Sequence, residues 1–226
     1  MWPKLGHLNQ GATFGNSAYS PTWLMKRAML LAALVIAAVL VGIVLWLRNS
    51  GPDASLFADL RDPRLTHMSD ERMLVVDATG DPNIVGARAF KQLFGRYYTL
   101  ERVSRRQRPP APRARWPKPA ETPRQQWVGH YALPVPGAAA LPSAARGDLP
   151  TSIATWAYGD VAEVLHVGPY STEEPDINRL LAFVTSKGYR AVGDHEEEYV
   201  RGPGAFFAGD PSKYLTIIRL RVEKSR

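Results

Sequence analysis

Three consecutive glutamates followed directly by a tyrosine, Glu196 to Tyr199, are the residues of this sequence best suited to chemistry. Successive side chains of a β-strand point to opposite faces, so Glu197 shares a face with Tyr199 while Glu196 and Glu198 point away. A carboxylate beside an aromatic ring suits an organic cation, because the ring adds about 0.5–2 kcal/mol of cation–π attraction to the charge. The alternative is a solvated strand edge, and we expect Glu196 and Glu198 to be exposed there.

Two further side chains are candidates for the same ligand-binding site. Trp116 aligns with Tyr199 when the two halves of the chain are compared, so the two rings could form opposite walls of a slot. The alternative is that Trp116 packs against the prolines that follow it. His130 alternates with Tyr131 along its strand and would reach the face of the sheet that helices leave open.

The sequence lacks the patterns of most catalytic and metal sites. It contains no cysteine, which excludes a disulfide framework, thiolate-ligated metals and a thiol nucleophile. Its five histidines are scattered and none has a partner at ligand spacing, so we expect no metal. No nucleophile elbow, P-loop or dinucleotide fingerprint is present, and we expect no cofactor.

The positive charge of the chain is local. The formal net charge is +7, and residues 102–124 account for it, with eight Arg or Lys against one Glu. The rest of the chain is therefore neutral overall. This pattern indicates one basic segment rather than a basic domain face, which argues against nucleic-acid binding.

One segment is apolar enough to cross a membrane. Residues 28–47 carry no charge, and at 1.5 Å per residue they span roughly 30 Å, the thickness of the bilayer core. A cleaved signal peptide is the alternative, but its apolar core is shorter and ends in a small-x-small site, which is missing here. We predict a single transmembrane helix with an extracytoplasmic body, a disordered segment 1–27 before it and a tether over 48–71.

The remainder of the chain, 72–226, reads as a duplication. Units 72–135 and 151–222 each have the order strand, helix, strand, strand, and the first contains a basic, Pro-rich stretch at 101–124. Two such units predict an α+β fold in which duplicated β-α-β-β units form one pseudo-symmetric antiparallel-sheet domain, with both helices on one face. Segments 153–158 and 161–167 are expected to pair as a hairpin.

Local patterns refine this prediction. Asp81 and Pro82 are expected to open the first helix, and a capping box over 171–174 is expected to open the second. The apolar face of the first helix is expected to consist of Phe90, Leu93, Phe94 and Tyr97. In the last strand Ile218, Leu220 and Val222 should pack under the helices. Ile217, Arg219 and Arg221 should then line an open, half-polar face.

The second unit resembles the GyrI-like, or AraC effector-binding, small-molecule-binding domain. The resemblance is carried by His166-x-Gly168-Pro169-Tyr170, Lys187-Gly188-Tyr189, Glu197-Glu198-Tyr199 with Pro203, and the strand Tyr214–Ile218. It covers 72–135 less well, and no helix-turn-helix accompanies it. The resemblance implies a cleft between the two units that binds small, often cationic or aromatic molecules, with the glutamate matching Glu197 projecting into it.

Three functions are compatible with these residues. The favoured one is a membrane-tethered domain that captures a cationic or aromatic amphipathic ligand with Glu197, Tyr199, Trp116 and His130. A second is a hydrolase that opens strained electrophilic rings with the cleft glutamate, as the resemblance suggests. No second carboxyl is visible on the face of Glu197, so catalysis is less favoured. A third is an adaptor whose basic run 102–118 binds anionic lipid or a protein partner.

Overall fold

The computed structural model describes residues 21–49, 51–101, 103–104, 106, 108–117, 122–141, 148–203 and 209–225. The chain divides into two units, Met1–Leu47 and Arg48–Arg226. The first contains helix α1, and the second contains the sheet with its helices.

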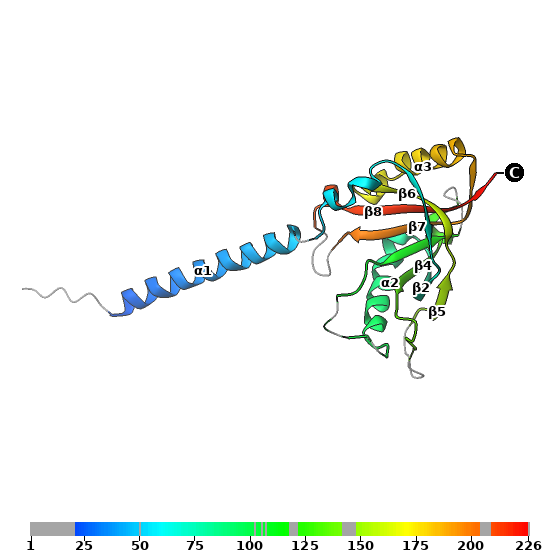
Figure 1. Ribbon diagram of the computed structural model, residues 1–226. Helices are drawn as coiled ribbons and strands as arrows, with labels where there is room; N and C mark the ends of the chain where they lie inside the picture. The colour runs from blue at the N-terminus through cyan, green and yellow to red at the C-terminus, as the bar shows by residue number, and fades with distance from the viewer. Residues whose placement is uncertain are drawn as a thin grey trace, which may run out of the picture. The chain divides into compact units, whose positions relative to one another are not determined.

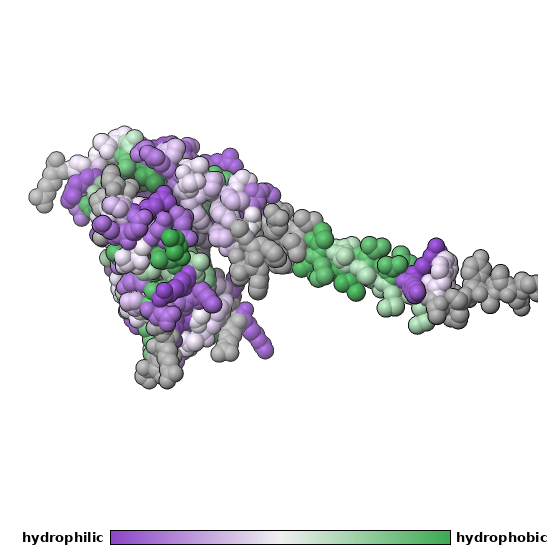
Figure 2. All heavy atoms as spheres, turned by 180° about the vertical axis from the view of Figure 1, so that it is seen from behind, coloured by the Kyte–Doolittle hydropathy of each residue, from purple (hydrophilic) through white to green (hydrophobic). Residues whose placement is uncertain are grey.

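Helix α1 runs from Pro21 to Asn49 and is apolar along most of its length. The stretch Met25–Ile43 has a mean hydropathy of 2.2 and none of it is buried. Figure 2 shows an apolar surface over most of its length. Its length and composition would let it cross a membrane, although a signal sequence has the same properties. The helix is longer than expected, because residues 21–27 are helical rather than disordered; residues 1–20 lie outside the described residues.

The second unit is built on one antiparallel sheet, with strands in the order β1-β6-β8-β7-β3-β4-β2-β5. The strands are β1 (Arg64–Met68), β2 (Glu71–Thr79), β3 (Arg113–Trp116), β4 (Val128–Pro134), β5 (Thr151–Trp156), β6 (Gly159–Val167), β7 (Tyr189–Arg201) and β8 (Leu215–Lys224). Helix α3 (Glu174–Ser186) accompanies the β6–β8–β7 half of the twisted sheet and α2 (Pro82–Tyr97) the β4–β2–β5 half (Figure 1). The predicted α+β class is confirmed.

The duplication is visible in the strand order. One unit is β2-α2-β3-β4 and the other is β6-α3-β7-β8, and their third elements, β3 and β7, pair at the centre of the sheet. Ala114 of β3 faces Glu197 of β7 in this central ladder. The three-glutamate run therefore lies where the two repeats meet.

The predicted hairpin over 153–167 is wrong, because β5 pairs with β2 of the other repeat rather than with β6. Strand β1 likewise pairs with β6. The register carries on from one ladder to the other, since Met68 faces Gly159 and Glu71 faces Trp156 with two residues between on each side. Two long bent strands, β1–β2 and β5–β6, thus run side by side and join the two ends of the strand order.

This closure overturns the expectation of an open second face. Arg219 and Ile217, which were expected to line it, are only 4 % and 6 % exposed. Apolar residues from the bent strands fill the same side of the sheet, among them Met73, Trp156 and Val161. The sheet therefore encloses its second face with its own strands.

The stretch expected to be a tether is largely folded onto the domain. It contains the 3-10 helix η1 (Ala54–Leu60), whose N-cap Asp53 accepts a hydrogen bond from the backbone of Ser55 at 2.9 Å, and then strand β1. Leu60 is buried against Leu165, Leu215 and Ile217. Three further 3-10 turns lie elsewhere in the domain, at η2 (Arg124–Gln126), η3 (Tyr170–Thr172) and η4 (Pro211–Lys213).

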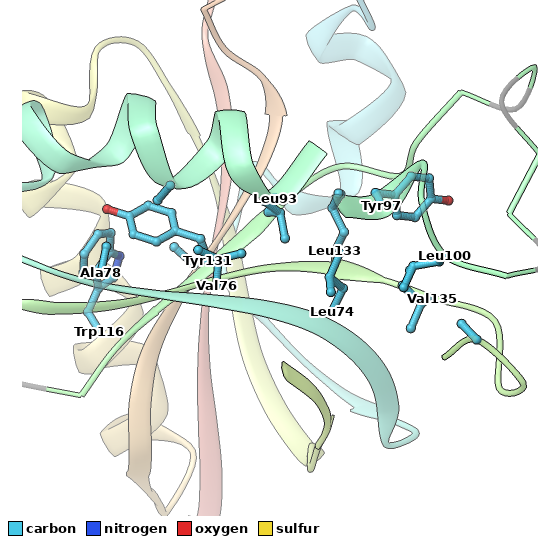
Figure 3. Packing of buried hydrophobic residues seen from close by; sticks show 13 residues of the cluster. Leu74, Val76, Ala78, Leu93, Tyr97, Leu100, Trp116, Tyr131, Leu133 and Val135 are labelled. Carbon is cyan, nitrogen blue, oxygen red and sulfur yellow. The ribbon is translucent and has the colours of Figure 1, made fainter. Parts of the chain in front are cut away.

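Both helices cover the same face of the sheet, as predicted. Asp81 caps α2 by accepting a bond from the Asn83 backbone at 2.9 Å, with Pro82 in the first turn. Leu93 and Tyr97 of its predicted face are buried in the cluster that Figure 3 shows. Under α3 the predicted residues Ile218, Leu220 and Val222 are also buried. The predicted capping box is not formed, because Glu173 occupies the N-cap position of α3 without a side-chain capping bond.

Candidate functional site

Glu197 lies on the helix-covered face at the junction of the two repeats. Its neighbours across the strands are Ala114 and Ile218, so small and apolar side chains flank it. The Tyr199 hydroxyl donates to Oε2 at 2.6 Å, and Nε2 of His195 lies 3.1 Å from Oε1. The Glu197 side chain is 14 % exposed, and among the described residues it forms no ion pair with an arginine or lysine. Its two oxygens thus contact a tyrosine hydroxyl and a histidine ring.

An aromatic row crosses this face from one repeat to the other. Neighbouring ring centroids lie 5.0–5.7 Å apart along Trp127, Trp116, Tyr131, Phe90, Tyr199, Tyr170 and Tyr214. The row passes between the repeats where Phe90 of α2 meets Tyr199 of β7 at 5.6 Å, nearly edge to face. Ring edges and faces of this kind are suited to flat apolar or cationic ligands.

Glycine makes the row possible at one point. A Cβ on Gly129 would lie 2.7 Å from the Tyr131 ring and 2.8 Å from the Trp116 ring, closer than side chains tolerate. Figure 3 shows these two rings together at one end of the buried cluster. Any larger residue at this position of β4 would push the two rings apart.

A second carboxyl group, that of Glu173, belongs to the same site. The residue is 5 % exposed and lies in the turn between η3 and α3. Burial, followed by the negative charge of Glu197, raises the pKa of Glu173 to about 9. The Thr216 hydroxyl lowers that pKa to a smaller extent, although neither Oε1 of Glu173 nor Oγ1 of Thr216 has a well-formed hydrogen bond among the described residues. Burial thus favours the neutral form of Glu173.

Buried polar atoms without partners gather on this face. In the part of the chain that the structure describes they are Trp116 Nε1, Tyr131 Oη, Glu173 Oε1 and Thr216 Oγ1. A buried polar atom without a hydrogen bond costs about 1–3 kcal/mol, so such atoms call for an explanation. Burial, and then the charge of Glu197, also raise the pKa of Tyr131 to about 12.

The opposite face of the same strands carries a fully partnered ionic network, which we define as Arg113, Arg115, Arg219, Glu71, Glu163, Glu196, Glu198 and Tyr158. Arg219 reaches Glu196 at 2.7 Å, Glu163 at 3.1 Å and Glu198 at 3.2 Å. Glu196 is 2 % exposed, so the expectation that Glu196 and Glu198 are solvated is wrong. The physical reason is that the bent strands enclose this face and supply Glu163 and Tyr158 to the network.

The structure brings three of the four predicted site residues to one face. Glu197 and Tyr199 are in contact, and Trp116 joins them through Tyr131 and Phe90 rather than facing Tyr199 directly. His130 points to the other face, where it pairs across the strands with Arg115 and its Nδ1 lies 2.6 Å from Asp77. It therefore does not join the other three residues.

Residues that the sequence interpretation missed complete the site. Glu173, Thr216, Tyr131, Phe90 and Tyr170 come from four elements that are distant in the sequence, so no local pattern groups them. Tyr170 follows the Gly-Pro turn of the quoted motif, and this was a usable signal. Among the described residues, no group of three or more His, Asp or Glu is placed to hold a metal ion.

Comparisons with known proteins agree with this geometry at the level of the fold. No family model matches the sequence, and no curated protein matches it. An uncharacterized conserved protein from Listeria innocua is 21 % identical with a TM-score of 0.59, over 75 % of this chain and 96 % of that one. A hydrolase from the same organism is 20 % identical with a TM-score of 0.59, over 77 % and 100 %. The C-terminal domain of EcmrR is 14 % identical with a TM-score of 0.51, over 72 % and 98 %.

Proposed function

We propose that this chain, which has the GyrI-like effector-binding domain fold, is a membrane-tethered protein that captures cationic aromatic molecules between its two repeats. The observation that carries the proposal is Glu197, a carboxylate that no arginine or lysine neutralises among the described residues, set in a row of aromatic rings. A cation would gain the charge of Glu197 and cation–π attraction from the rings.

The site offers an internal control for this proposal, because Glu198 is the next residue of the same strand and faces the other way. Glu197→Gln removes the charge and keeps the shape, and we expect the affinity to fall roughly ten- to a hundredfold, the value of one charged hydrogen bond at about 1.5–3 kcal/mol. Glu198→Gln should leave the affinity unchanged and lower the stability, because Glu198 bonds Arg113 and Arg219.

The measurement is calorimetric titration of the full chain in lipid nanodiscs with 1-methyl-4-phenylpyridinium, a flat monocation, against empty nanodiscs. Equal affinities of the unmutated protein and Glu197→Gln would contradict the proposed site.

The membrane tether is part of the same proposal and rests on α1. A helix of this length and hydropathy would span a bilayer if it is retained after export. An epitope placed before α1 should therefore stay with the membrane fraction after washing at high salt. Release of the domain without the epitope would identify α1 as a cleaved signal sequence instead.

A second candidate function, hydrolysis of a strained electrophilic ring, is favoured by the pair of carboxyls and by the hydrolase among the similar structures. Glu197 would take a proton from a water molecule as its oxygen attacks the ring carbon, while Glu173 gives its proton to the leaving atom as the ring bond breaks. Turnover of an activated cyclopropane or epoxide that is lost in both Glu173→Gln and Glu197→Gln would support this function. Turnover that survives both changes would exclude it.

The adaptor function gains no support. Two arginines of the basic run, Arg113 and Arg115, are held inside the ionic network by Glu198 and Glu196. They are therefore not available to bind lipid or a partner.

A further inference from the structure

The two carboxyl groups of the site differ in the number of their hydrogen-bond partners. Glu197 has two partners for its two oxygens, whereas Oε1 of Glu173 is buried and has no hydrogen bond among the described residues. A carboxyl in this state is not part of a structural ion pair. It is a buried acid beside the proposed cation site.

We infer that the site distinguishes ligands by charge: a monocation binds against Glu197 alone, whereas a rigid dication binds against both carboxylates and releases the proton of Glu173 to solvent. This inference rests on the proposed function, because both ligands must reach Glu197.

The groups around Glu173 allow this second charge. Glu197 comes from β7, Thr216 from β8 and Tyr170 from η3, and none of them carries a positive charge. Asp176 of α3 also faces Glu173, but its carboxylate is engaged by His166 and by Arg179, both at 2.9 Å. No arginine or lysine pairs with Glu173 in the described part of the chain, so the ligand is the available source of positive charge.

Proton release follows from the two causes that raise the pKa of Glu173. The pKa of Glu173 is raised chiefly because the side chain is buried, and secondly because the Glu197 charge repels a second negative charge. A dication places a positive charge against each carboxylate, so the O–H bond of Glu173 breaks and its proton passes to buffer. A monocation balances only the charge of Glu197, and burial, the larger cause, keeps most of the proton on Glu173.

The pH dependence separates the two binding modes. Below the pKa of about 9, each unit of pH should raise the dication affinity by up to tenfold, with levelling above it. The monocation affinity should rise much less over the same range, because a monocation removes only the smaller of the two causes. The site would then favour dications increasingly as the pH rises from 7 to 9.

A matched pair of probes tests this inference. The monocation 1-methyl-4-phenylpyridinium and the dication 1,1′-dimethyl-4,4′-bipyridinium have the same biaryl shape, and neither charge changes with pH. The full chain in nanodiscs is titrated calorimetrically between pH 7 and 9, in two buffers of different ionisation enthalpy that together count the protons released. We expect up to one proton for the dication and clearly fewer for the monocation.

Variants assign the proton to its residue. Glu173→Gln should abolish proton release and the pH dependence with the dication, since glutamine has the shape of the neutral acid and cannot ionise. Glu174→Gln is the matched control, because Glu174 is the next residue and is exposed, and it should change neither.

The outcomes separate this inference from the proposed function. Dication binding without proton release, or a pH dependence that survives Glu173→Gln, would overturn the inference and leave the proposed function standing. Failure of both probes to bind would overturn the proposed function, and this inference with it.

Discussion

The two faces of the central strands surround their carboxylates with different partners. Glu196 and Glu198 point into the enclosed face, where arginines bond them, and Glu197 points under the helices, where it has only a tyrosine and a histidine. Buried charge that is fully paired serves structure, because removal of one partner leaves the other uncompensated. A buried carboxylate without an arginine or lysine partner is costly, and such groups are common at functional sites. Side chains that alternate on one strand thus divide into a structural set and a set that we propose binds ligand.

The largest effect should come from the paired face. Arg219→Met would leave Glu163, Glu196 and Glu198 buried without their shared cation, and we expect it to lower the free energy of unfolding by about 3–5 kcal/mol. Denaturant unfolding of the full chain in detergent would measure this. Arg190→Met is the control, because the Arg190–Glu223 pair is exposed and worth about 0–1 kcal/mol. Similar losses of unfolding free energy in the two variants would show that the enclosed network stabilises the protein no more than an exposed ion pair does.

An effect of intermediate size should come from Glu173 and should depend on pH. Its pKa is about 9 in the folded chain against 4.5 in the unfolded chain, so the folded state keeps a proton that the unfolded state loses between these values. Stability from this group is complete below pH 4.5 and is lost as the pH rises toward 9, by at most about 1.4 kcal/mol per pH unit. Glu173→Gln lacks this loss.

The difference in unfolding free energy between the unmutated protein and Glu173→Gln, measured at pH 5, 7 and 9, should therefore change steadily in favour of the variant. A constant difference would show that Glu173 titrates like an exposed glutamate. Glu173 would then not be a neutral acid at pH 7.

The smallest effect should come from Tyr131, whose buried hydroxyl has no partner among the described residues. Tyr131→Phe removes an unsatisfied polar atom and keeps the ring between Trp116 and Phe90. The free energy of unfolding should stay within about 1 kcal/mol or rise, because loss of an unpaired hydroxyl is nearly neutral. A loss of more than about 2 kcal/mol on thermal or denaturant unfolding would show that the hydroxyl has a structural partner.

The sequence by itself determined the duplicated units, the apolar first helix and the direction of Glu197 relative to its neighbours. Each of these is a local property. Alternation along a strand is fixed by backbone geometry, so Glu197 and Tyr199 had to share a face wherever the strand lay. The spacing of Leu93 and Tyr97 likewise predicted the buried side of α2 before its partners were known.

Only the tertiary structure decided what each face would meet. The side chains of Glu196 and Glu198 are buried because residues 64–76 pair with residues 151–163. The local sequence around the two glutamates does not indicate this pairing between distant segments. Glu173 became the second acid of the site because the turn before α3 places it near Glu197, although its sequence pattern fits a helix cap equally well. Burial and charge partners depend on which elements close over a residue, and that choice is made by long-range packing rather than by local sequence.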